Sequence, residues 1–95
     1  MPKTKMKYEE RTMQFDMINR LLDEINEDRS VPRNIRTAVS KAKEDLSNEK
    51  IDMPVRINSA ISILDEVSND TNIPIYTRTQ IWNIVSMLEV MGKEE

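Results

Sequence analysis

Leu22-Asp23-Glu24-Ile25 and Leu64-Asp65-Glu66-Val67 are two copies of one stretch, 42 residues apart (22 to 64). The same shift aligns further positions without a gap: Asp28 with Asp70, Val31-Pro32 with Ile73-Pro74, Arg36-Thr37 with Arg78-Thr79, Val39 with Ile81 and Leu46 with Leu88. A period of about 40 residues is the length of a two-helix unit. We therefore predict one helical hairpin that occurs twice.

Three similar turn sequences divide the chain: Ser30-Val31-Pro32, Asp52-Met53-Pro54 and Asn72-Ile73-Pro74. Proline suits the first turn of a helix and disfavours a helical conformation at the residue before it. Each triplet thus separates two helices; we expect its small polar residue to cap the new helix and its apolar residue to cover the core. Four helices are predicted, over residues 8–27, 32–47, 54–68 and 74–91, with Gly92 as a left-handed stop.

Each predicted helix has one apolar face at three- and four-residue spacing. The core candidates, helix by helix, are Phe15, Ile18, Leu21, Leu22 and Ile25; Ile35, Ala38, Val39, Ala42 and Leu46; Ile57, Ala60, Ile61, Leu64 and Val67; and Ile81, Ile84, Val85 and Leu88. We predict a single all-α domain, an up-and-down four-helix bundle built from two hairpins (8–49 and 50–92). Residues 1–7, with three lysines, are expected to form a flexible basic arm.

Composition excludes most catalytic chemistry. The chain has no cysteine, no histidine and one glycine, so thiolate nucleophiles, imidazole bases, His-based metal sites and glycine-rich phosphate loops are absent. We expect no enzyme activity, no catalytic residue, no cofactor and no metal. The longest apolar runs are too short to cross a bilayer, so we expect a cytoplasmic protein without membrane contact. A net charge of −3 argues against a dedicated nucleic-acid binder.

Two resemblances support the fold. The repeat resembles a HEAT-type hairpin, with an acid ending one helix and an arginine opening the next. Nearly the whole chain also resembles the archaeal uncharacterised protein family 0147, through residues 18–25, the stretch from Asp28 to Arg36, and Pro54-Val55-Arg56 ahead of Ala60 and Leu64. This second resemblance implies an all-helical fold in a cytoplasmic archaeal setting, and it implies no site residues.

Two sets of charged residues are candidate sites. Asp28 with Arg36, and Asp70 with Arg78, are interpreted as structural ion pairs that brace two turns; binding of an anion by the arginines is the alternative. The second set is basic, and with the lysines of residues 1–7 it offers a possible anion or nucleic-acid contact. Its members are Arg29, Arg33, Arg36, Lys41 and Lys43.

The two copies differ where Arg33 and Ser40 correspond to Ile75 and Trp82. Ile75 and Trp82, together with Tyr76, Met87 and Val90, make the fourth helix apolar over most of its circumference. Either the first helix covers this side with its spare Tyr8, Met13 and Met17, or the side binds a partner.

We favour a function in which the protein binds another protein or a second copy of itself. The predicted interface residues are Ile75, Trp82, Met87 and Val90. The alternative is a nucleic-acid-associated protein that uses the basic set.

Overall fold

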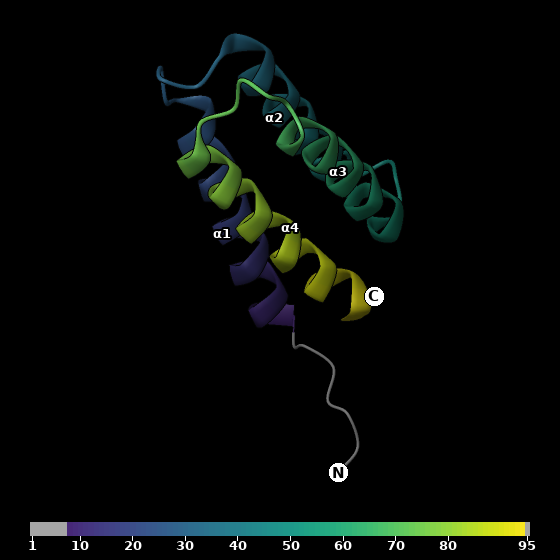
Figure 1. Cartoon of the computed structure of the whole chain (residues 1–95). Helices are drawn as coiled ribbons and strands as arrows, with labels where there is room; N and C mark the ends of the chain where they lie inside the picture. The colour runs from purple at the N-terminus through teal and green to yellow at the C-terminus, as the bar shows by residue number, and fades with distance from the viewer. Residues whose placement is uncertain (1–7, 95) are drawn as a thin grey trace.

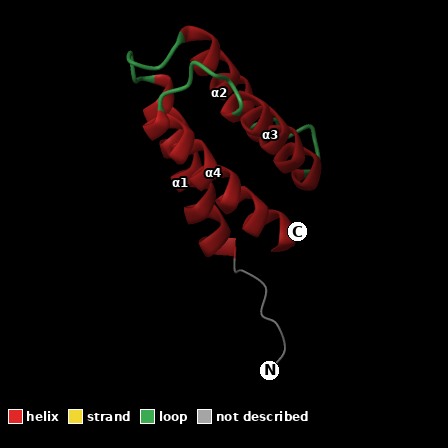
Figure 2. Cartoon of the chain, viewed as in Figure 1, coloured by secondary structure: helices red, strands yellow, loops and turns green. Residues whose placement is uncertain are grey.

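The computed structural model describes residues 8–94, and the predicted basic arm over residues 1–7 lies outside them. The described residues form four helices, α1 (Tyr8–Asn26), α2 (Arg33–Leu46), α3 (Met53–Ser68) and α4 (Ile75–Glu94), and contain no strand (Figure 2). The prediction of an all-helical chain with four helices is confirmed. The predicted boundaries differ from the observed ones by one residue at most, except at the end of α4, which extends three residues further.

The helices lie in two layers. α1 packs against α2 and α4, and α3 packs against the same two helices. Figure 1 shows α1 beside α4 and α2 beside α3, with the start of α1 and the end of α4 at one end of the molecule. Each loop between helices has six residues (27–32, 47–52 and 69–74), which is short enough to make consecutive helices antiparallel neighbours.

The core between the layers reproduces the sequence repeat. Five apolar pairs matched by the shift of 42 residues are buried in both copies: Leu22 with Leu64, Ile25 with Val67, Val31 with Ile73, Val39 with Ile81, and Leu46 with Leu88. The four leucines have no exposed surface. Burial of such a side chain is worth roughly 1.5–3 kcal/mol. The duplicated apolar pattern therefore gives a duplicated core, which α4 extends with Ile84, Val85 and Met91.

All three loops contain the same turn. The second residue of each loop, Asp28, Asn48 or Asp70, accepts a hydrogen bond on its side-chain Oδ1 from the backbone N–H two residues later, at 2.9, 3.1 and 2.8 Å. This is an Asx-turn, in which a short side chain takes the place of a backbone carbonyl. The repeated turn gives the three connections the same direction change.

An arginine eight residues after each Asx residue donates to backbone carbonyls around its loop. Carbonyls at helix ends and in turns lack intrahelical partners, and a cation near a helix C-terminus is also favoured by the helix dipole. The bonds run from Arg36 Nε to Val31 O (3.1 Å), from Arg56 Nε to Ile51 O (2.6 Å) and Nη1 to Leu46 O (3.4 Å), and from Arg78 Nε to Ser68 O (3.1 Å) and Nη2 to Asp70 O (3.4 Å).

These bonds correct the predicted ion pairs. Among the described residues, neither the Asp28 carboxylate with Arg36 nor the Asp70 carboxylate with Arg78 forms a salt bridge. Each carboxylate accepts the backbone N–H of its Asx-turn, and each guanidinium donates to backbone carbonyls. The hydroxyl and backbone N–H of Ser30 donate to Asp28 and hold the pKa of that carboxyl below its usual value, with a smaller contribution from the charge of Arg36.

Two predictions about helix ends are wrong. Pro32 and Asp52 are the N-cap residues of α2 and α3, and neither helix has a side-chain cap. Gly92 does not stop α4. It lies inside the helix and has no positive φ. A Cβ atom at this position would lie 3.6 Å from Ile57 Cγ2, an ordinary van der Waals contact.

Candidate functional site

Four large apolar side chains of α4 point into solvent. Ile75 is 80% exposed, Tyr76 70%, Trp82 56% and Val90 49%; we call these four residues the α4 patch. Ile75 and Trp82 are seven residues apart, which is two helical turns, and Tyr76 and Val90 are fourteen apart. The helix therefore holds them in two adjacent rows on its outer side, while Ile81, Ile84 and Leu88 point into the core.

The α1 helix does not cover this side. Met13 and Met17, which the alternative placed over Trp82, are themselves 71% and 47% exposed. The side chain of Tyr8 lies outside the described part of the chain. Met17 is nine residues, or half a turn around the helix, from Asn26, which accepts a hydrogen bond from Ser40 of α2. Met17 thus lies on the side of α1 away from α2, toward α4, and adds to the exposed apolar surface.

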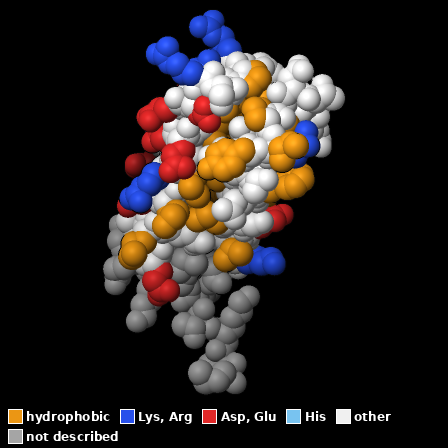
Figure 3. Space-filling model, turned by 60° about the vertical axis from the view of Figure 1, so that its left-hand side comes forward, with side chains coloured by type: hydrophobic (Ala, Val, Ile, Leu, Met, Phe, Trp, Pro, Cys, Tyr) orange, Lys and Arg blue, Asp and Glu red, His pale blue; other side chains and the backbone are white. Residues whose placement is uncertain are grey.

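A space-filling view shows the result. Figure 3 turns the side of α1 and α4 forward, and hydrophobic side chains gather there in a band, with most charged groups at its margins. Monomeric proteins rarely expose a large contiguous apolar surface without a function for it.

One predicted interface residue is less exposed than the others. Met87 is only partly exposed and packs against the core cluster. It lies about 120° around α4 from Ile75 and on the same side as Tyr76, eleven residues away. Met87 therefore borders the α4 patch and contributes less exposed surface than its four members.

The basic set is largely occupied by internal contacts. Arg36 binds a loop carbonyl, Lys43 pairs with Asp23 of α1 (Nζ to Oδ1, 2.6 Å), and Lys41 pairs with Asp45 (2.8 Å), whose hydrogen bond raises the pKa of the lysine. The side chains of Arg29 and Arg33 are exposed and have no partner among the described residues. Two free arginines are a small anchor for a polyanion.

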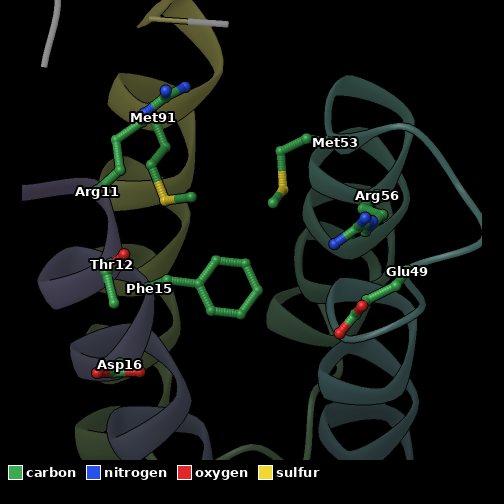
Figure 4. A pocket seen from close by; sticks show the side chains of 8 residues that line it. All are labelled: Arg11, Thr12, Phe15, Asp16, Glu49, Met53, Arg56 and Met91. Atoms are coloured by element: carbon green, nitrogen blue, oxygen red, sulfur yellow. The ribbon is translucent and has the colours of Figure 1, made fainter. Parts of the chain in front are cut away.

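A depression of about 630 Å³ opens between the layers where α1 begins and α4 ends. Figure 4 shows Phe15 of α1 and Met53 of α3 pointing toward each other across it, with Met91 of α4 beside them. Charged side chains of both signs surround this apolar floor: Arg11, Asp16, Glu49 and Arg56. Arg56 is already bound to the loop carbonyls, and the other charged side chains around the depression are of both signs. The depression therefore offers space for an apolar group and does not favour a ligand of either charge.

The described residues contain neither a candidate metal site nor a candidate membrane span. Residues 8–94 contain no group of three or more acidic side chains placed to bind a metal ion. Within the same range, no helix combines the length and the apolar character needed to span a membrane.

Sequence reasoning missed the middle loop. Asn48 and Arg56 have the same eight-residue spacing as Asp28 and Arg36, whereas the proline of the middle loop, Pro54, falls two positions later than Pro32 and Pro74 do in theirs. The consequence is visible at Ile51, which takes the place of Val31 and Ile73 in the turn and is exposed, while Met53 packs on the core. Spacing between the Asx residue and the arginine would have found this.

Comparison with known proteins places the chain. Residues 2–91 match the family described as Uncharacterised protein family (UPF0147). A UPF0147 protein of Methanocaldococcus jannaschii is 59% identical over 69 residues, covering 73% of this chain and 74% of the relative. One of Methanothermobacter thermautotrophicus is 52% identical over 75 residues, covering 79% and 74%.

Two crystal structures share the fold. That of the unknown function protein MMP1188 is 47% identical, covers 92% of this chain and 96% of its own, and superposes with a TM-score of 0.80. That of a UPF0147 protein from Thermoplasma acidophilum is 36% identical, covers 85% and 95%, and has a TM-score of 0.82. These matches agree with the resemblance in the sequence, and this chain belongs to the uncharacterised archaeal family UPF0147.

Proposed function

We propose that this protein acts by binding another protein or a second copy of itself through the outer face of α4, and that it catalyses no reaction itself. The supporting observation is the α4 patch: four large apolar side chains, one of them a tryptophan, exposed on one helix. Tryptophan and tyrosine are enriched among residues that dominate binding energy at protein interfaces.

The matched positions of the first hairpin strengthen the proposal. Ile75 and Trp82 correspond to Arg33 and Ser40 on α2, which are exposed but polar. Exposure at these positions is thus a property of the hairpin fold, whereas apolar character is specific to α4. Apolar side chains in water do not stabilise the monomer. Free energy would be gained from the α4 patch only in a complex that buries it.

We also propose that the scaffold is an up-and-down four-helix bundle made of two hairpins that resemble HEAT repeats. The ring of packed neighbours from α1 to α2, α3, α4 and back supports this arrangement. Such a scaffold is held by its core and loops, so the outer face of α4 is free to serve binding alone.

Nucleic-acid binding is less well supported, because only Arg29 and Arg33 of the basic set are free of internal partners. It would show a steep dependence of affinity on salt concentration. Contact through the α4 patch would show little such dependence, because the patch is uncharged.

The test is site-specific photo-crosslinking in native lysate. A photoreactive phenylalanine analogue replaces Ser86, an exposed residue between Trp82 and Val90, or Glu44, the matched exposed residue of α2. We expect protein adducts from position 86 that persist after nuclease treatment and disappear when Ile75→Arg and Trp82→Ser are added. Equal adducts from both positions, adducts sensitive to nuclease, or none at position 86 would refute the proposal.

A further inference from the structure

We propose that the α4 patch pairs with the α4 patch of a second copy of this chain, with the two α4 helices antiparallel about a twofold axis next to Trp82 and Asn83. This inference rests on the proposed function, since it names the partner of the same surface. Closed twofold dimers are the commonest assemblies of identical chains, and their interfaces must be self-complementary.

The outer side of α4 is self-complementary when the helix is reversed. Around a centre between residues 82 and 83, Ile75 and Val90 are equally distant, as are Thr79 and Ser86. In an antiparallel pair each residue faces its counterpart, so Ile75 would lie against Val90 of the partner. The two Trp82 side chains would meet beside the axis, at the centre of the interface, where hot-spot residues are found.

Small residues occupy the middle of this side. Thr79 and Ser86 lie between the apolar side chains on the outward-facing surface and would let the two helices approach closely. The Thr79 hydroxyl already donates to the Ile75 carbonyl at 3.2 Å. Its burial in an interface would therefore leave no unsatisfied donor, which is the usual penalty for burying a polar group.

Charge also permits self-pairing. From Ile75 to Val90 the sequence has two charged residues, Arg78 and Glu89, and Arg78 is bound to loop carbonyls. In the antiparallel arrangement the two copies of Glu89 would be about 20 Å apart along the helix axis. This exceeds the screening length of about 8 Å at physiological salt, so the repulsion between them would be small.

The available area reaches the lower end of a standard interface. A helix of 20 residues is about 30 Å long. A strip that spans α4 and the adjacent flank of α1 is about 20 Å wide, taking helices about 10–12 Å in diameter with axes 8–10 Å apart. The strip is roughly 600 Å², and each partner in a standard interface buries about 600–1,000 Å². The exposed Met17 adds to the apolar surface of α4 on the α1 side.

Sedimentation equilibrium over a range of concentrations tests the pairing. We expect the wild-type chain to dimerise and the Ile75→Arg/Trp82→Ser variant, which takes the residues of the first hairpin, to raise the dissociation constant by roughly 30-fold or more. The matched Arg33→Glu/Ser40→Glu variant on α2 should dimerise as the wild type does. If circular dichroism shows lost helix content in the first variant, Ile75→Arg alone replaces it, since Ile75 is the most exposed of the four.

Cysteine cross-linking tests the antiparallel register, because the chain has no cysteine of its own. Asn83→Cys chains should form a disulfide dimer on mild oxidation. Val90→Cys chains should not, since the two sulfur-bearing residues would be about 22 Å apart along the axis, whereas a disulfide needs Cα atoms about 4.4–6.8 Å apart. A mixture of Ile75→Cys and Val90→Cys chains should cross-link.

The outcomes separate the two proposals. A wild-type chain that stays monomeric overturns the pairing; if position 86 still forms adducts with other proteins in lysate, the proposed function survives without it. Cross-linking of Val90→Cys as efficient as that of Asn83→Cys overturns the antiparallel register. A monomer without adducts at position 86 overturns both proposals.

Discussion

The hairpin of α1 and α2 carries seven charged residues among 19 and six among 14, whereas the hairpin of α3 and α4 carries three among 16 and four among 20. The apolar pairs matched by the repeat, such as Leu22 with Leu64, are buried in both hairpins, and the loop inside each hairpin has the same Asx-turn. Most of the difference lies at outward-facing positions, such as Arg33 and Ile75, whereas at Lys43 and Glu49 the second hairpin has the buried Val85 and Met91. The outer surface of a hairpin can therefore change its polarity while the shared core pairs are kept. Four experiments test this distinction between core and surface.

The largest effect is expected at the matched core leucines. Leu22→Ala and Leu64→Ala should each lower the free energy of unfolding by about 2–5 kcal/mol, because each creates a cavity at a fully buried position. Urea unfolding followed by circular dichroism measures both. Costs that differ by several kcal/mol would contradict the equivalence of the two hairpins.

The loop arginines come next. Arg56→Ala and Arg78→Ala each remove bonds to two carbonyls, and Arg36→Ala removes one. We expect losses of about 1–3 kcal/mol, smallest for Arg36→Ala. The exposed Arg33→Ala is the control and should change stability by less than about 0.5 kcal/mol. If Asp28→Asn proved as damaging as Arg36→Ala, a direct charge pair would have to be reconsidered.

A stabilising change is expected only in α4. Gly92→Ala should raise the free energy of unfolding by about 0.5–1 kcal/mol, because alanine is the better helix former and its Cβ would meet Ile57 at an ordinary 3.6 Å. Thermal unfolding measures the shift. A lower melting temperature would indicate that Gly92 has a packing or terminating role after all.

The smallest effect concerns pH. The pKa of Asp28 is lowered in the folded chain, chiefly by the Ser30 hydroxyl, so its contribution is present above the unfolded pKa of about 3.9 and is lost as pH falls through the folded pKa. Asp28→Asn keeps the turn acceptor, as Asn48 does in the middle loop, but cannot titrate. Its stability should decline less below about pH 4 than that of the wild type; an identical decline would contradict this assignment.

The sequence by itself determined the four helices and their buried faces, because helical periodicity and proline position are local signals. The repeat also indicated which residues would be buried twice, since Leu22 and Leu64, or Val39 and Ile81, occupy the same place in the same hairpin. It found the polarity difference at Ile75 and Trp82 as well, which needs only alignment of the two copies.

The tertiary structure decided what the side chains do at the loops and surface. Arg36 and Arg78 bind carbonyls rather than Asp28 and Asp70, because the backbone geometry of the turn commits each carboxylate to an N–H. Trp82 is exposed, and the methionines of α1 that could have covered it are exposed as well. Such outcomes depend on directions in space between distant segments, which residue spacing along one chain does not contain.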